Sequence, residues 1–105
     1  MLAGGASIGN TMIPNIGVLQ IEEIESGYKI EGRVRDDYEK LEILRRLGGI
    51  RKGQISRAKF LTKKGSLVNE TFEIIESRFD EEELPDKRLL IFTILLKQHL
   101  APVEH

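Results

Sequence analysis

The chain has 105 residues, a formal net charge of −1 and no cysteine. One domain with a single core is expected at this length. With 40% apolar and 31% charged residues, the composition excludes a disordered chain and a membrane protein. The lack of cysteine excludes disulfides, thiolate zinc sites and cysteine nucleophiles. The two histidines, His99 and His105, are too few for a histidine-rich metal site.

The sequence shows neither a secretory signal nor a membrane-spanning segment. Residues 1–17 contain no lysine or arginine, and glycine, asparagine and proline interrupt their apolar residues. The longest apolar stretch, residues 89–96, is far shorter than the ~20 residues that a spanning helix needs. We therefore expect a cytoplasmic protein that does not bind a membrane.

The N-terminus differs in composition from the remainder of the chain. Residues 1–15 are rich in glycine, asparagine, serine and threonine and include Pro14, which is typical of a flexible arm. Residues 16–105 contain no internal repeat and no low-complexity tract. We expect a flexible N-terminal arm followed by a single domain.

The segment that follows the arm predicts a β-hairpin. Apolar residues alternate on both sides of a turn at Gly27, which indicates strands at residues 17–24 and 28–35. A helix over residues 19–25 is the alternative, because its isoleucines are also spaced three apart.

The middle of the chain predicts a helix and then a strand. Within residues 36–47 the leucines recur every three positions, and the aspartates at the start suit an N-cap and the helix dipole. Gly48 and Gly49 end this helix. Residues 50–62 alternate in the manner of a strand, although neither of the two faces is purely apolar.

Two further helices are expected in the last third of the chain. Residues 66–79 carry apolar side chains at helical spacing. A helix over residues 87–100 would be apolar nearly all round, so it would be central to the core or shared with a second chain. The fold class expected is therefore a small α+β domain with a hairpin, a basic wing-like strand region and two or three helices. A homo-oligomer is expected to form through the C-terminal helix, with an interface made by Leu89, Ile91, Phe92, Leu95 and Leu96.

Charge is distributed unevenly along the chain. Residues 45–65 contain eight basic residues and no acidic one, whereas the remainder contains the other eight basic and all seventeen acidic residues. Such a block is where a polyanion would bind, because lysine and arginine reach phosphates and release counterions. The alternative is a solvated face, or one that pairs with the acidic residues 81–83. The candidate nucleic-acid-binding residues are Arg45, Arg46, Arg51, Lys52, Arg57, Lys59, Lys63 and Lys64.

The same region resembles winged-helix transcriptional regulators over about residues 38–79. The segment Leu44-Arg45-Arg46-Leu47-Gly48-Gly49-Ile50 is similar to the end of a recognition helix, and the basic residues after it to a β-hairpin wing. Leu61-Thr62-Lys63-Lys64-Gly65 is similar to the Leu-Thr-x-x-Gly turn that leads into the next helix. The resemblance implies dimerisation through a long apolar helix and backbone contacts to DNA from the wing residues Arg51, Lys52, Arg57 and Lys59.

These observations predict a nucleic-acid-binding module, a dimeric winged-helix-like regulator with a basic wing, whose partner is duplex DNA or RNA. The alternative is a non-catalytic interaction or assembly protein, such as an adaptor or a small viral or plasmid-borne subunit. No glycine-rich phosphate loop, metal-ligand spacing or acid–base pair stands out. We therefore expect no enzymatic activity, no cofactor and no metal.

Overall fold

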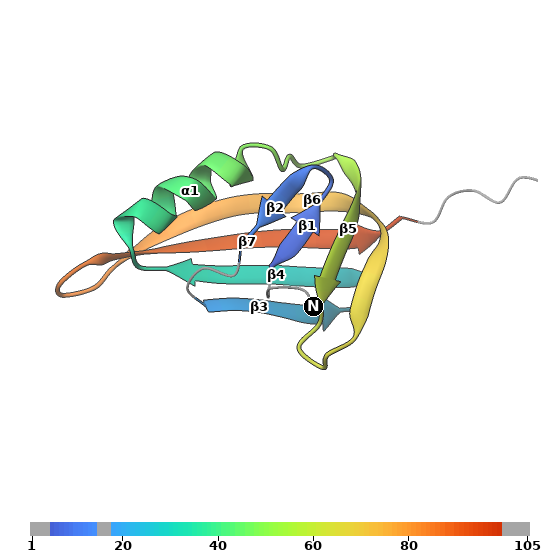
Figure 1. Cartoon of the computed structure of the whole chain (residues 1–105), viewed down its shortest axis with the longest axis horizontal. Helices are drawn as coiled ribbons and strands as arrows, with labels where there is room; N and C mark the ends of the chain where they lie inside the picture. The colour runs from blue at the N-terminus through green and yellow to red at the C-terminus, as the bar shows by residue number, and fades with distance from the viewer. Residues whose placement is uncertain (1–4, 15–17, 100–105) are drawn as a thin grey trace, which may run out of the picture.

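The structure is a computed structural model of the chain, and it describes residues 5–14 and 18–99. In these residues seven strands form one antiparallel sheet, accompanied by one helix (Figure 1). The strand order in the sheet is β2-β1-β5-β6-β7-β4-β3. The elements in chain order are β1 (Ala6–Ile8), β2 (Thr11–Ile13), β3 (Val18–Ile24), β4 (Gly27–Val34), α1 (Asp37–Leu47), β5 (Ile55–Leu61), β6 (Leu67–Glu83) and β7 (Arg88–Gln98).

The sheet curls strongly on itself. β6 and β7 run along the length of the molecule, whereas β5 and the β1–β2 hairpin cross in front of the sheet in Figure 1. The turn after β5 reaches the strand at the opposite edge, where the Lys63 amide donates to the Ile21 carbonyl at 3.3 Å. The curled sheet and α1 therefore enclose one apolar interior.

Aromatic rings fill the part of this interior that lies behind β5. Phe60 of β5 and Phe72 of β6 are fully buried, and their ring centroids are 6.0 Å apart. The ring of Tyr28 from β4 meets both edge-on, at 5.2 Å from Phe60 and 5.8 Å from Phe72. At the other end, α1 contributes Ile43 and Leu47 to the same core.

Several elements agree with the sequence-based predictions. The hairpin of β3 and β4 is confirmed, and so is the strand β5. The helix is confirmed as α1, in which the Asp36 side chain accepts a hydrogen bond from the Glu39 amide at 3.0 Å. That bond satisfies one of the free amides of the first turn, as expected for an N-cap.

The prediction of two C-terminal helices, over residues 66–79 and 87–100, is wrong, because these segments contribute to the strands β6 and β7. In β6, a register shift between Ile74 and Glu76 interrupts the alternation of inward and outward side chains. The interruption gives the apolar residues on either side of it a spacing that imitates a helix. β7 is central and has buried side chains on both faces, so it reads as a continuous apolar run.

The fold is therefore mainly β, and the expected α+β class with two or three helices is wrong. The winged-helix description falls with it, because the segment after the Leu61–Gly65 turn continues as a strand of the sheet. No helix in the described parts of the chain is long and apolar enough to cross a membrane.

The N-terminal segment also differs from the expected flexible arm. Residues 6–13 form the β1–β2 hairpin, and Ser7 and Ile8 pair with Lys59 and Ala58 of β5. Ile8 and Ile13 are buried in the core. Of the other residues expected in the arm, 1–4 and 15 lie outside the described part of the chain.

Candidate nucleic-acid interface

β5 turns its basic side chains outward. Ala58 and Phe60 alternate with Arg57 and Lys59 along the strand, and the first pair is buried while the second pair is exposed. Because successive side chains of a strand point to opposite faces, burial of Phe60 fixes Arg57 and Lys59 on the outer face. The core that lies behind β5 thus determines where these two cations point.

The turns at the two ends of β5 add four more cations. Arg51 and Lys52 lie in the turn before the strand, which contains Gly53 at a φ of 88°. Lys63 and Lys64 lie in the turn after it, which contains Gly65 at a φ of 85°. A positive φ of this kind favours glycine at both turns. We call the six cations of β5 and its turns the basic ribbon: Arg51, Lys52, Arg57, Lys59, Lys63 and Lys64.

The side chains directly opposite the central cations of the basic ribbon are polar but uncharged. Across the strand pairs, Arg57 lies opposite Thr71, whereas Lys59 lies opposite Asn69 on one side and Ser7 on the other. The Arg57 Nε donates to the Asn69 Oδ1 at 2.8 Å, which holds the guanidinium over β6. Sequence reasoning missed these neighbours, because they become visible only once residues 67–73 are read as a strand.

Acidic residues lie at the margins of the basic ribbon. Glu70 is in register with Ala58, so it stands on the opposite face from Arg57 and accepts a hydrogen bond from Gln98 at 3.3 Å. Lys63 and Lys64 line a hollow together with Glu22 and Glu23. No ion pair within 4.0 Å joins any ribbon cation to a carboxylate of the described residues. Glu73, in register with Ile55, lies on the same face as Arg57, one residue pair further along the strands. The cations at the centre of the ribbon thus have one acidic residue of β6 on their face but form no ion pair with it.

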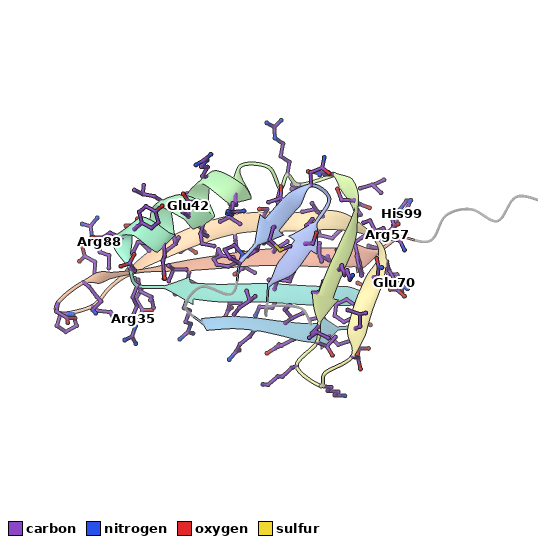
Figure 2. All side chains as sticks on the ribbon, viewed as in Figure 1. Arg35, Glu42, Arg57, Glu70, Arg88 and His99 are labelled. Carbon is purple, nitrogen blue, oxygen red and sulfur yellow. The ribbon has the colours of Figure 1, made fainter. Side chains whose placement is uncertain are left out.

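Two of the eight predicted binding residues lie elsewhere. Arg45 and Arg46 belong to the last turn of α1, and both contact Glu42, at 3.8 Å in each case. The Arg46 guanidinium also donates to the Met12 carbonyl at 2.9 Å. Figure 2 shows Glu42 on the helix, well apart from Arg57 on β5. The structure thus brings six of the eight residues together and assigns these two to the helix.

The residues predicted for an oligomer interface all lie on β7. Leu89, Phe92 and Leu96 are buried within the chain, and Ile91 and Leu95 are half-buried. The helix that was expected to carry this interface does not exist. An oligomer contact through Ile91 and Leu95 stays a prediction.

Tyr28 of β4 lines the same hollow as Lys63 and Lys64, in the turn after β5. Its pKa is raised. Burial is the main cause, and the negative charges of Glu23 and Glu70 add to it. The folded chain therefore favours the neutral phenol over the phenolate, relative to the usual pKa of 10.0. This contribution to the free energy of unfolding is complete below pH 10 and is lost as the pH rises through the pKa of the folded state.

We expect the Tyr28→Phe variant to lose less stability above pH 10 than the wild-type chain, because the variant has no phenol to ionise at this partly buried position. Urea unfolding at a series of pH values from 8 upward measures the difference between the two proteins. Parallel losses of stability in the two proteins would contradict this role of Tyr28.

The described residues contain no group of three or more histidines, cysteines, aspartates or glutamates that could hold a metal ion. The fold and the basic ribbon together define a small curled antiparallel sheet with one cationic strand face. The chain matches no protein-family model, no curated protein and no solved structure.

Proposed function

We propose that the protein is a nucleic-acid-binding module that contacts the phosphate backbone through the basic ribbon. The observation that carries this proposal is the outward pair Arg57 and Lys59, which lie directly opposite uncharged side chains, form no ion pair with a described carboxylate and are flanked by four further cations. Cations held on a rigid strand reach phosphates without the cost of first breaking an ion pair. Six cations follow one another along β5 and its turns, so they outweigh Glu73 on the same face and give this surface a positive potential.

The chemistry of the ribbon favours binding without base recognition. The outer face of β5 carries Ile55, Arg57, Lys59 and Leu61, and none of these is an aromatic residue that could stack on bases. The partner side chains Asn69 and Thr71 lie close to the strand surface. Lysine and arginine on such a surface position a nucleic acid by its phosphates, which carry no direct sequence information. We therefore propose a module that binds duplex DNA or RNA with little sequence preference.

The double variant Arg57→Glu/Lys59→Glu tests this proposal. We expect the wild-type chain to bind a fluorescent DNA duplex with an affinity that falls steeply between about 50 and 200 mM salt. The variant should bind at least about tenfold more weakly, and its salt slope should be smaller by about two, because each phosphate contact contributes about one unit. Fluorescence anisotropy titrations at four salt concentrations measure both quantities, and an RNA duplex is titrated in parallel.

Arg78→Glu/Lys87→Glu is the matched control, because it changes the net charge by the same amount on the β6–β7 hairpin. Figure 2 places the end of this hairpin, marked by Arg88, at the opposite end of the molecule from Arg57. The control should keep nearly the wild-type affinity and slope. Equal losses in the two variants would show that net charge alone governs binding, and would overturn the assignment to β5.

A further inference from the structure

β6 extends well beyond the strand that pairs with it. β5 pairs with residues 67–73 of β6, and the last bonds on that side join Gln54 and Gly53 to Ile74, at 2.8 and 2.7 Å. Further along, β6 pairs with β7 alone as far as Glu83. No described strand lies along the other side of residues 75–83, which we call the free β6 edge.

Hydrogen bonds at the end of β7 fix which backbone groups this edge exposes. The Gln98 amide bonds to Ser26 on the β4 side, whereas the His99 amide bonds to Thr71 of β6. Since bonding direction alternates along a strand, the odd-numbered residues of β7 face β6. Their partners in the free β6 edge are Glu76, Arg78, Asp80 and Glu82.

The residues that alternate with these partners direct their backbone groups away from the sheet. They are Ser77, Phe79 and Glu81, together with Glu83 at the end of the strand. Their N–H and C=O groups form a row that can hydrogen-bond with an additional strand. This row continues the direction in which Ile74 bonds to Gln54.

The side chains of the edge combine apolar and acidic character. Phe79 is 53% exposed although its strand partner, Phe92, is buried. Residues 75–83 contain five acidic residues and one basic residue. Arg88 neutralises part of this charge through contacts to Glu81 at 3.6 Å and Glu83 at 3.2 Å. Glu76, Asp80 and Glu82 have no such contact with a described residue.

The charge of the edge disfavours pairing with a second copy of the chain. Two copies joined through β6 would bring their acidic residues together, and like charges in facing strands are destabilising. The other long edge strand, β3, carries Glu22 and Glu23, whereas β2 is only three residues long. A basic extended segment complements the charge of the free β6 edge, and the described edge strands of a second copy do not supply one.

We propose that the free β6 edge is a docking site for an extended, lysine- or arginine-rich segment of another protein, which adds to the sheet as a further strand. Backbone hydrogen bonds to Ser77, Phe79 and Glu81 supply affinity, as in other cases of strand addition. The carboxylates select positive charge, and the exposed ring of Phe79 packs against an apolar side chain of the added strand. This proposal goes beyond nucleic-acid binding and uses a different surface.

The first experiment uses a synthetic nine-residue peptide in which lysine and valine alternate. We expect it to bind the full chain and to slow hydrogen exchange at the amides of Ser77, Phe79 and Glu81. A peptide with glutamate in place of lysine should not bind. A lysine–valine peptide with N-methyl groups on alternate amides should bind at least about tenfold more weakly, because it cannot form the strand ladder.

Variants of the chain then locate the binding site. Ser77→Pro removes one outward N–H and leaves the bonds to β7 in place, so it should weaken peptide binding about tenfold or more. Ser77→Ala, its matched control, keeps the N–H and should bind as the wild type does. Asp80→Lys/Glu82→Lys should reverse the preference in favour of the glutamate peptide. Arg57→Glu/Lys59→Glu should bind the lysine peptide normally, which separates this site from the basic ribbon.

Three results would overturn the proposal. The first is that no peptide binds, and the second is that the N-methylated peptide binds as well as the unmodified one. The third is that binding leaves the exchange of the edge amides unchanged, which would indicate electrostatic attachment without an added strand. The peptide comparison and the exchange measurement use the wild-type chain, so they remain decisive even if Ser77→Pro does not fold.

Discussion

Phe72→Ala should lower the free energy of unfolding by about 3–5 kcal/mol, the usual range for a large aromatic side chain removed from a core. The ring is fully buried on β6 and packs against Tyr28 and Phe60. These neighbours are held on strands that are hydrogen-bonded on both sides, so they cannot move together to fill the cavity. Since domains of this size are stable by only about 5–15 kcal/mol, the variant should be close to unfolding.

Phe79→Ala is the matched control, because the two phenylalanines lie on the same strand. Phe79 is about half exposed, and its removal should cost less than about 1 kcal/mol. Urea unfolding followed by circular dichroism measures both variants, and the transition midpoint of Phe72→Ala should fall much further. Similar losses in the two variants would show that the aromatic cluster does not anchor this end of the sheet.

Local patterns predicted the elements whose periodicity is simple. The β3–β4 hairpin alternates regularly around Gly27, and α1 has a capping aspartate and a repeated leucine spacing. The prediction for the last third of the chain failed because two features of its strands conceal the alternation of inward and outward side chains. The register shift after Ile74 breaks the pattern of β6, and burial on both faces fills the pattern of β7 with apolar residues. Both features depend on neighbouring strands, which no local window contains.

The candidate binding residues were predicted from charge and not from structure. The acid-free block contains the six cations of the basic ribbon, which follow one another along β5 and its two turns. Arg45 and Arg46 were included only because they are adjacent in sequence. Their contacts with Glu42 come from a helical spacing of three and four residues, within an element that was itself predicted. Helical geometry could thus have removed them from the candidate set.

The free β6 edge could not be found from the sequence. Residues 75–79 belong to a predicted helix and residues 80–83 to no predicted element, so no strand edge was expected there. The unpaired backbone follows from a difference in length, because β6 spans 17 residues whereas β5 spans 7. Strand lengths of this kind are set by the partners across the sheet. Recognition of the edge therefore required the register of both neighbouring strands.

Gly27→Ala should lower the free energy of unfolding by about 3 kcal/mol, the upper part of the range for a side chain forced into a packed site. Gly27 is buried at the start of β4, and a Cβ there would overlap the Leu96 carbonyl of β7. The overlap is with backbone, so it cannot be relieved by rotating a side chain. β4 would have to separate from β7, which would weaken the bond from the Gln98 amide to Ser26 and the contacts of Tyr28.

The control for Gly27 is Gly65→Ala in the turn after β5. Gly65 has a φ of 85° and no atom within 4 Å of an added Cβ, so the cost is local backbone strain of about 1–2 kcal/mol. Hydrogen exchange distinguishes the two variants in kind, because only Gly27→Ala should speed exchange at the Gln98 amide. A Gly27→Ala protein with wild-type exchange at Gln98 would show that β4 and β7 tolerate the added methyl group. If both expectations hold, the close approach of β4 to β7 positions Tyr28 against Phe60 and Phe72, and so supports the strand that presents the basic ribbon.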